Sequence, residues 1–503
     1  MSSNPAKKTK TQSKVINEDD VVNSINSRRS NELIIAICGA IGSGTTELSE
    51  QLKKSLDHNG YAIETIKISK LIFEIRNDPE QLSGIERFER YHRFQDAGNE
   101  IREKLGNNYL SKAVIEEIVK RRDNYLDTEK GETKTTKKIA YIVDQLKHPE
   151  EMKLLKLIYR QCFYLIGINS TEKDRKLYLL NKAISSKNAN KLIERDRKQE
   201  EKFGQQVEKT FFLSDFFIHN KGNSESIKDA VIRFIDLAHG VNGKTPTRDE
   251  KGVYEAFSVS LQSACLSRQV GAAIVNQEGD IIATGCNDVP AYGGGLYNAE
   301  HGSDDHRCVF KGGECSNDLH KKLLKKDFED ILNKRSISDA NHIADELLNY
   351  SQAKNLIEYS RSIHAEMAAL MQLARSSGQS SVGATLYCTT YPCHNCARHI
   401  VAAGIERVIY IEPYEKSLAL RLHNDAITNQ SEKNKVSFEP FQGISPSRYM
   451  KFFKASDDRK KDGTATFIAT KDSYHADPNF MDSYYDYESR VIDDKSQKKN
   501  PFT

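Results

Sequence analysis

No long apolar segment is present in this chain. Its longest apolar run, residues 33–41, is about half of the ~20 residues that a membrane-spanning helix needs. A secretory leader is not expected either, because the first residues are polar and include lysines. We therefore expect a cytoplasmic protein that makes no membrane contact. The absence of tryptophan excludes nothing.

Paired cysteines are also lacking. The nine cysteines are odd in number and do not show the spacing of a disulfide framework, which fits a reducing cytoplasm. The formal net charge of +3 indicates no particular class of partner. A length of 503 residues exceeds one ordinary hydrophobic core, so two domains with tails are expected.

Composition shifts divide the chain. Residues 1–30 carry lysines but no acid before Glu18, which predicts a disordered basic arm, solvated rather than bound to nucleic acid. We expect a first domain over 31–240, a linker over 241–251 and a second domain over 252–455. The charged, tyrosine-rich tail over 456–503 is expected either to wrap an oligomer or to be disordered.

The most informative motif lies in the second domain. The chain reads His364-Ala365-Glu366 and, further on, Pro392-Cys393-His394-Asn395-Cys396. A catalytic zinc takes three nitrogen or sulfur ligands from protein and leaves the fourth position to water. The pattern predicts His364, Cys393 and Cys396 as those ligands, and it predicts Glu366 as the proton shuttle.

Helix geometry supports this assignment. Pro392 suits a first helical position, and Gly404 suits the residue after a helix end, so both cysteines are predicted in the first turn of a helix. There the helix dipole favours the thiolates that metals bind. A cysteine pair by itself would equally fit a redox pair or a structural zinc knuckle. His394 and His399 lie near the cysteines, but neither brings a carboxylate with it.

The first domain opens with a strand, a glycine loop and a helix. Residues 33–38 predict a buried strand, and residues 39–46 are followed by a helical stretch to about Leu56. The arrangement resembles a P-loop, although Thr45 stands where the lysine belongs, so phosphoryl transfer should suffer more than binding. The residues predicted to hold a nucleotide, with Mg²⁺, are Gly39, Gly42, Ser43, Gly44, Thr45, Thr46 and Asp144.

Later segments resemble nucleoside monophosphate kinases. Strands are predicted over 139–144, which ends in Asp144, over 163–168, and over 214–220. We therefore expect a parallel α/β sheet that senses a nucleotide or holds an oligomer together; the alternative is a decayed scaffold that only packs against its neighbour. Arginines and aromatic residues alternate over 87–94, which favours a helix with one packed and one solvated face over a phosphate site.

The second domain adds paired strands over 268–275 and 280–285 before Asn287, and a closing segment over 436–446. With the zinc motif, the stretch from about Tyr254 to Phe453 resembles deoxycytidylate deaminases. The resemblance implies an αβα cytidine-deaminase-like domain in which water activated by Zn²⁺ attacks C4 of cytosine while Glu366 moves protons. It also implies a homohexamer and substrate contacts at Asn287, Ala365, Thr389 and Tyr391.

The fusion of the two halves resembles bacterial antiphage deoxycytidine nucleotide deaminases. That resemblance implies conversion of free dCMP and/or dCTP to deoxyuridine nucleotides and ammonia during infection, and an inhibitory small RNA as a partner. The sequence leaves open the phosphate preference, the ligand of the glycine loop, the trigger of activation and the surface that would contact RNA.

A long insertion separates Asn287 from His364. His306, Cys308 and Cys315 within it predict a second, structural zinc site, and the alternative is a mobile loop near the substrate mouth. Three other functions compete with the main interpretation. A polynucleotide deaminase shares the zinc chemistry, a nucleotide kinase would need the missing lysine, and an RNA-binding scaffold would not need the carboxylate of Glu366.

Overall fold

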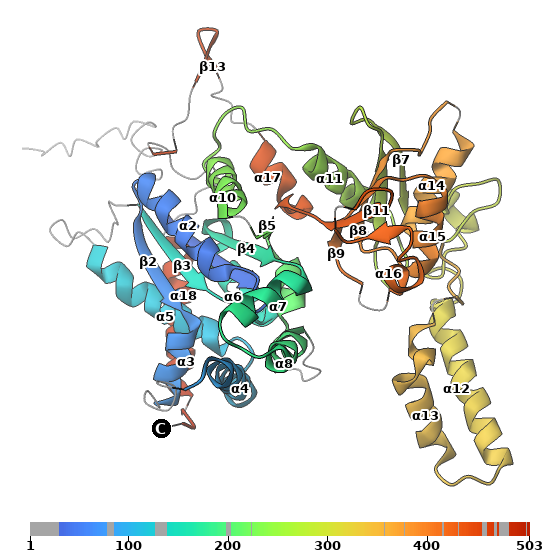
Figure 1. Cartoon of the computed structure of the whole chain (residues 1–503), viewed down its shortest axis with the longest axis horizontal. Coiled ribbons are helices and arrows are strands. Elements are labelled where there is room, and N and C mark those ends of the chain that lie inside the picture. Colours follow the sequence, from blue (N-terminus) through green and yellow to red (C-terminus); the bar gives the residue numbers. More distant parts are fainter. Residues whose placement is uncertain are drawn as a thin grey trace, which may run out of the picture.

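The computed structural model describes two α/β units side by side, joined through the segment after residue 240 (Figure 1). The residues it describes are 30–77, 85–125, 138–197, 203–222, 224–356, 358–376, 378–414, 417–430, 432–454, 460–466, 470–471, 482–498 and 500–502. The expected basic arm before Ser30 lies outside this range. Within it, no helix combines the length and the apolar character that crossing a bilayer requires.

A six-stranded sheet forms the amino-terminal unit, in the order β12-β5-β4-β1-β3-β2. The first five strands in sequence are mutually parallel, and β12 joins the edge antiparallel to β5. All four predicted strands of this half are present. The strands are β1 (Glu32–Gly39), β2 (Ala62–Lys67), β3 (Ile139–Asp144), β4 (Phe163–Asn169), β5 (Phe216–His219) and β12 (Gly443–Ile444).

Helices cover both faces of this sheet, which is why its central strands are continuous apolar runs. Helices α2 (Thr45–His58) and α10 (Ser224–Ala238) pack on one face. The other helices of this half are α3 (Ile68–Arg76), α4 (Arg87–Leu105), α5 (Tyr109–Arg122), α6 (Pro149–Tyr159), α7 (Glu172–Asn181), α8 (Ser186–Arg197) and α9 (Val207–Phe212), with 3₁₀ turns η1 (Asp123–Tyr125) and η3 (Arg160–Cys162).

The second unit is a mixed sheet in the order β10-β11-β9-β8-β6-β7. Strands β8, β9, β11 and β10 are parallel, and β6 is antiparallel to both of its neighbours. Its strands are β6 (Gly271–Val275), β7 (Ile281–Cys286), β8 (Thr385–Thr390), β9 (Arg407–Glu412), β10 (Ile427–Thr428) and β11 (Val436–Pro440). The predicted hairpin over 268–286 is present, although its first strand begins only at Gly271.

Alternating side chains divide this sheet into two faces. Ala273 and Tyr387 face α11 (Arg248–Ser260), whereas Ala272 and Leu386 belong to the cluster formed with α14 (Ala365–Arg375) and α15 (His394–Ala402). The unit therefore has the predicted αβα layers of a cytidine deaminase-like fold. Its minor elements are α16 (Ala419–Leu422), η4 (Ala299–Asp304), η5 (Gln352–Asn355) and η6 (Pro446–Arg448).

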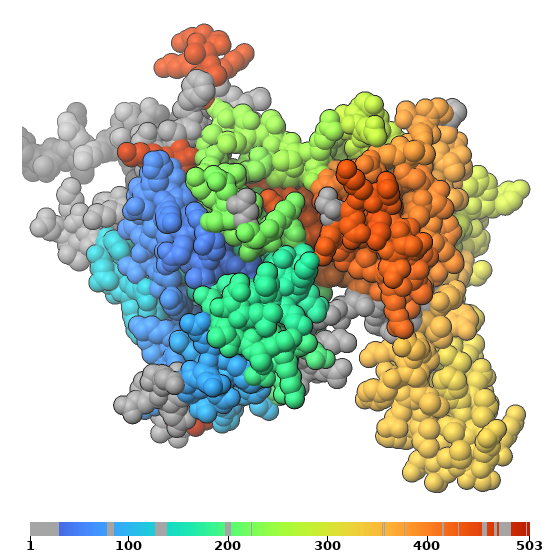
Figure 2. All heavy atoms as spheres, viewed as in Figure 1, coloured from blue at the N-terminus to red at the C-terminus, as the bar shows by residue number. Residues whose placement is uncertain are grey.

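The insertion forms a helical hairpin that stands away from the body (Figures 1 and 2). It consists of α12 (Ser316–Lys334) and α13 (Ala340–Tyr350), which pack mainly on each other. Helix α12 has no buried residue.

The chain crosses back to the first unit after the second sheet. β12 extends the first sheet, and Phe452 of α17 (Tyr449–Phe453) packs on Phe234 and Tyr164. Farther on come β13 (Lys460–Lys461), β14 (Thr464–Ala465) and α18 (Asp482–Gln497), which packs against α5 and α6. The described part of the tail is therefore partly helical and packs on the first unit, where Tyr484 is fully buried.

The linker is also shorter than expected. Helix α11 begins at Arg248, inside the predicted linker, because Thr247 and Glu250 form a capping box. Glu250 is buried and is held by Arg233 of α10 and by the backbone N–H of Ile444, which lies 3.1 Å from its Oε1. One carboxylate thus connects α10, α11 and β12.

Candidate active site

The zinc motif assembles at the amino ends of two neighbouring helices. His364 is the N-cap of α14, so Glu366 lies in the first turn of that helix. Cys393 is the N-cap of α15, and Cys396 follows in its first turn. The two helices lie on the same face of the second sheet, which brings residues 29 to 32 positions apart into one cluster.

The expected helix start is shifted. Pro392 precedes the N-cap instead of occupying the first helical position, and Cys393 lies at the cap itself. The reason is that the Cys393 Sγ accepts the backbone N–H of Cys396 at 3.4 Å, as a capping side chain does. The helix ends at Ala402, just before Gly404 with φ +73°, as predicted.

The three predicted ligands converge. His364 Nδ1 lies 3.3 Å from Cys393 Sγ and 3.4 Å from Cys396 Sγ. Ligands held about 2.0–2.3 Å from one tetrahedral ion lie roughly 3.3–3.8 Å apart, so this donor set fits zinc. Among the described residues, these three form the one group of metal-type donors with atoms within 4.8 Å of one another. His394 and His399 do not join them.

Glu366 completes the centre. Its carboxyl is 4% exposed, and its Oε2 lies 3.4 Å from Cys396 Sγ. Burial raises the pKa of this carboxyl above its ordinary value. A hydrogen bond from Cys396, with a further contribution from His364, lowers the pKa of the Cys393 thiol, which favours the thiolate that a metal binds. The donor set and a buried carboxyl of raised pKa therefore lie side by side.

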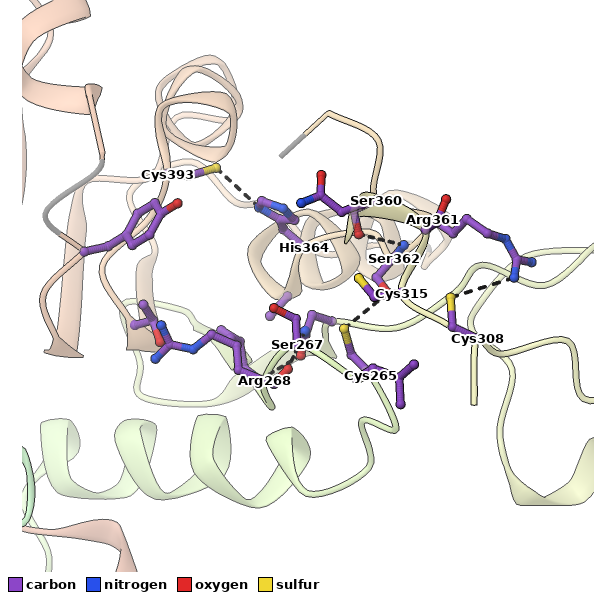
Figure 3. A pocket seen from close by; sticks show the side chains of 18 of the residues that line it. Cys265, Ser267, Arg268, Cys308, Cys315, Ser360, Arg361, Ser362, His364 and Cys393 are labelled. Atoms are coloured by element: carbon purple, nitrogen blue, oxygen red, sulfur yellow. Dashed lines mark hydrogen bonds between the residues drawn. The ribbon is translucent and has the colours of Figure 1, made fainter. Parts of the chain in front are cut away.

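A pocket with a volume of about 190 Å³ opens over this centre (Figure 3). His364, Glu366 and Cys393 lie in its wall together with Asn287 and Tyr391. Its volume is below the usual ~300–1,000 Å³ of ligand pockets, so it encloses a small group rather than a large ligand. The remaining wall comes mainly from the loop after α11, from the insertion with the start of α12, from the loop before α14, and from Tyr414.

The four predicted substrate contacts have different surroundings. Ala365 and Tyr391 line the pocket, and the Tyr391 hydroxyl has no hydrogen-bond partner among the described residues. Asn287 also lines it, but its carboxamide accepts the Val270 N–H at 2.7 Å and donates to the Arg268 carbonyl at 2.8 Å. The Thr389 hydroxyl accepts the Gly271 N–H at 3.1 Å, outside the pocket wall. Asn287 therefore holds the 268–270 segment in place.

Sequence reasoning missed several lining residues. Arg268 and Arg361 carry charge at the pocket, and Tyr414 also lines it. Arg268 is half-exposed and pairs with Glu412, whereas Arg361 donates to the His306 carbonyl at 3.0 Å. A basic residue directly before the first strand of the hairpin was the one sequence signal for Arg268. Nothing in the sequence singled out the others.

The predicted second zinc site does not assemble. Cys308 and Cys315 both line the catalytic pocket, but they form no donor group with His306 among the described residues. The His306 ring instead packs edge-on against Tyr297, at 5.5 Å between centroids. The reason is that Arg361 holds the backbone of this loop and lies 3.9 Å from Cys308 Sγ.

The glycine loop of the first unit lines a separate cavity of about 500 Å³. Of the predicted nucleotide residues, Gly42, Gly44, Thr45, Thr46 and Asp144 lie in its wall. Gly39 and Ser43 are packed behind the wall, and a Cβ on Gly39 would lie 2.8 Å from the Ile168 carbonyl. Gly42 and Gly44 have φ values of +81° and +101°, which other residues rarely adopt. Whether this cavity binds a nucleotide stays a prediction.

Comparison with known proteins agrees with the zinc centre. The family model described as "Cytidine and deoxycytidylate deaminase zinc-binding region" matches residues 246–412. The deoxycytidylate deaminase of Enterobacteria phage T2 is 33% identical over 162 residues, which cover 32% of this chain and 78% of the relative. The enzyme of Enterobacteria phage T4 is 32% identical over 162 residues, covering 32% and 76%.

A eukaryotic relative shows the same match. The deoxycytidylate deaminase of Saccharomyces cerevisiae is 30% identical over 170 residues, which cover 34% of this chain and 39% of the relative. These similarities fall on about a third of the chain, the part that carries the three ligands and Glu366. The phage T2 relative is matched over most of its own length, and the chain belongs to the deoxycytidylate deaminase family.

Proposed function

We propose that the chain catalyses zinc-dependent hydrolytic deamination of free deoxycytidine nucleotides, dCMP and/or dCTP, to deoxyuridine nucleotides and ammonia. One observation carries the proposal. A three-ligand metal cluster and one buried carboxyl lie at the base of a small pocket, which is what removal of an amine from a nucleobase requires.

The protein supplies position and proton transfer. His364, Cys393 and Cys396 would hold zinc, which supplies Lewis-acid activation of water when bound. Glu366 accepts the proton that water loses as its oxygen adds to C4 and delivers it to N3 of the base. It then accepts the remaining proton of the hydroxyl added to C4 and passes it to the exocyclic amine, so that C4=O forms as the C4–N bond breaks and ammonia leaves. A carboxyl with a raised pKa suits both directions of transfer.

A free nucleotide is favoured over a nucleic-acid strand. The pocket volume of about 190 Å³ suits one base, and Arg268 and Arg361 at its rim are candidates for the phosphate. Neither arginine distinguishes a monophosphate from a triphosphate. Both nucleotides therefore belong in the first assay.

The deciding experiment uses the zinc-loaded full chain with dCMP, dCTP, CTP, cytidine and a cytosine-containing single strand. Ammonia release and the uracil product are measured for each. Turnover of dCMP or dCTP at least 100-fold faster than of the single strand would support the proposal. Preferred turnover of the strand would replace it with polynucleotide deamination.

The proposal extends to the cell. The fusion of a deaminase to a glycine-loop unit supports depletion of the deoxycytidine nucleotide pool during phage infection, with the first unit as a nucleotide-responsive regulator and an inhibitory small RNA as partner. Phage plating on cells that carry the wild-type chain or Glu366→Gln tests the role. Equal plating together with unchanged dCTP levels would rule it out. Copurifying RNA and the mass of the purified assembly test the RNA and the proposed hexamer.

A further inference from the structure

The cavity in the first unit lies between the glycine loop, the start of α3 and the first half of α4. We propose that it binds a nucleoside monophosphate, with the phosphate at the start of α2 and the base against Gln95. The inference rests on the regulatory part of the proposed function and names its ligand class. Its test measures binding and not turnover, so either proposal can fail alone.

Charge identifies the ligand as an anion. Six basic residues line the cavity, and two of them are neutralised within the fold: Arg102 by Glu151 at 2.8 Å and Lys147 by Asp196 at 3.0 Å. The other four are Lys67, Arg87, Arg90 and Lys182. Asp144 is the one acid among the described lining residues. The surplus of positive charge lies opposite the uncapped amino end of α2, where backbone N–H groups point outwards.

The glycine loop is short of donors for a polyphosphate. The Ile41 N–H is taken by the Asp196 carboxylate at 2.5 Å, and the Ser43 N–H is taken by the Ala40 carbonyl at 3.0 Å. Thr45 stands in place of the lysine that usually reaches the outer phosphates, and its hydroxyl accepts from Gln145 Nε2 at 2.6 Å. Asp196 is 1% exposed, and it holds both the Ile41 N–H and the Lys147 ammonium, two donors that a phosphate chain would otherwise use. The N–H groups of the loop that remain, at Gly42, Gly44, Thr45 and Thr46, gather at the start of α2 and suit one phosphate.

Gln95 identifies the rest of the ligand. This side chain lines the cavity and is 3% exposed, yet neither its amide nitrogen nor its amide oxygen has a partner among the described residues. A buried polar group without a partner is unfavourable because it has lost its hydrogen bonds to water, so it points to a missing ligand. A carboxamide offers a donor beside an acceptor, which complements the edge of a nucleobase.

Aromatic side chains complete the base site. Phe94, adjacent to Gln95 on α4, and Tyr91, one turn earlier, both line the cavity, as does Ile72 of α3. The Arg90 guanidinium lies 5.7 Å from the centre of the Phe94 ring, so it stands between the aromatic wall and the cationic side. The cavity thus has an apolar part, where the Gln95 carboxamide can recognise a base, and a separate anion-binding part. Its volume of about 500 Å³ is in the range of nucleotide-sized pockets.

The test is calorimetric titration of the zinc-loaded full chain with AMP, dTMP, ATP, dTTP and inorganic phosphate. None of these carries cytosine, and Arg268→Ala in the catalytic pocket serves as the control for binding there. We expect at least one monophosphate to bind at least 10-fold more tightly than its own triphosphate and than inorganic phosphate, unchanged in Arg268→Ala. Triphosphate binding as tight as the monophosphate, or a loss of binding in Arg268→Ala, would overturn the proposal.

Two variants test the assigned residues. Gln95→Met is expected to leave the unfolding midpoint of the ligand-free protein unchanged or higher, and to weaken monophosphate binding at least 10-fold. A lower midpoint with unchanged binding would show that Gln95 serves the fold alone and would overturn the base site. Asp196→Asn removes the negative charge at the loop and is expected to narrow the difference in affinity between AMP and ATP at least threefold. If the difference in affinity between AMP and ATP is unchanged in this variant, the proposed role of Asp196 in excluding the triphosphate is overturned.

Discussion

Glu366 Oε2 lies 3.4 Å from Cys396 Sγ, so the buried carboxyl lies directly beside a predicted metal ligand. Metal binding and proton transfer are thus assigned to neighbouring side chains, and a mutation can test the two roles separately. Glu366→Gln keeps the size of the side chain and all three ligands but removes the proton carrier.

We expect Glu366→Gln to retain zinc and to lose at least ~10²–10⁴-fold in kcat, the usual contribution of positioned proton transfer. Metal content by mass spectrometry and dCMP turnover are measured on the same sample. The exposed Glu103→Gln serves as the control and should keep both. A zinc-loaded Glu366→Gln enzyme with wild-type turnover would disprove the assigned role.

Zinc stoichiometry separates the two predicted metal sites. Because His364, Cys393 and Cys396 form the one donor group of the described residues, we expect one zinc ion per chain. Cys396→Ser should lose it, whereas Cys308→Ser and Cys315→Ser should keep it although both line the same pocket. Two zinc ions per chain, with one lost in Cys308→Ser, would restore the second site.

Removing zinc should also destabilise the second unit. A ligand that binds only the folded state raises the free energy of unfolding, and thiolate ligands bind zinc tightly at neutral pH. We expect a chelator to lower the thermal midpoint of the wild-type chain and to leave that of Cys396→Ser unchanged. Differential scanning calorimetry with and without chelator provides the comparison, and an equal shift in both proteins would argue against the site.

The tail helix is held by a buried ion cluster. Arg122 of α5 donates at 2.7 Å to Glu488 of α18 and also pairs with Glu32 of β1, and all three side chains are at most 5% exposed. Glu488→Ala leaves Arg122 and the Tyr159 hydroxyl each short of one buried partner, while Glu32 still pairs with Arg122, and we expect a loss of about 1–3 kcal/mol. Asp486→Ala on the same helix removes only an exposed pair with Arg490, worth about 0–1 kcal/mol. Denaturant unfolding of both variants checks the contrast.

His239 predicts an acid-sensitive fold. Its ring donates from Nδ1 to the Ile235 carbonyl at 2.8 Å and accepts the Tyr61 hydroxyl at Nε2 at 2.7 Å, as a neutral imidazole does. Burial lowers its pKa from 6.5 to about 4, so between these pH values the unfolded chain binds a proton that the folded chain does not.

Stability should therefore be complete above pH 6.5 and should fall as the pH drops towards about 4, by roughly 3 kcal/mol in total for this group. His239→Asn is expected to flatten that part of the pH profile, whereas the exposed His342→Asn should not. The free energy of unfolding at pH 7.5, 6, 5 and 4.5 gives the slopes. Equal slopes in wild type and His239→Asn would contradict the assignment.

Local motifs carried most of what the sequence could predict. The ligand set, Glu366 and the four strands of the first sheet follow from residue types at fixed spacing, because helix and strand periodicity act over short distances. The helix α15 begins at His394, two residues after the predicted Pro392, for a local reason: the Cys393 thiol caps it.

Long-range pairing was beyond the sequence. Tyr484 donates its hydroxyl to Glu32 at 2.8 Å across 452 positions, and a polar, tyrosine-rich tail gives no sign of a partner so distant. The short strand β12 likewise has no recognisable hydrophobic periodicity, and only its pairing with β5 defines it as a strand. Arg361 lies at the pocket beside Cys308 and Cys315 of the insertion, and no local pattern indicates that placement.

The return of the chain to its first sheet makes that unit discontinuous: the catalytic unit is an insert between β5 with α10 and the edge strand β12. Two covalent crossings join the halves, and Glu250 ties both crossings together. Because two connections join the halves, the halves cannot swing freely about a single hinge. Their relative motion is restricted to small rotations about the two connections. Tyr391 and Tyr414 line the catalytic pocket on one side and a cavity of about 450 Å³ between the halves on the other. Such a rotation would therefore change the positions of both side chains.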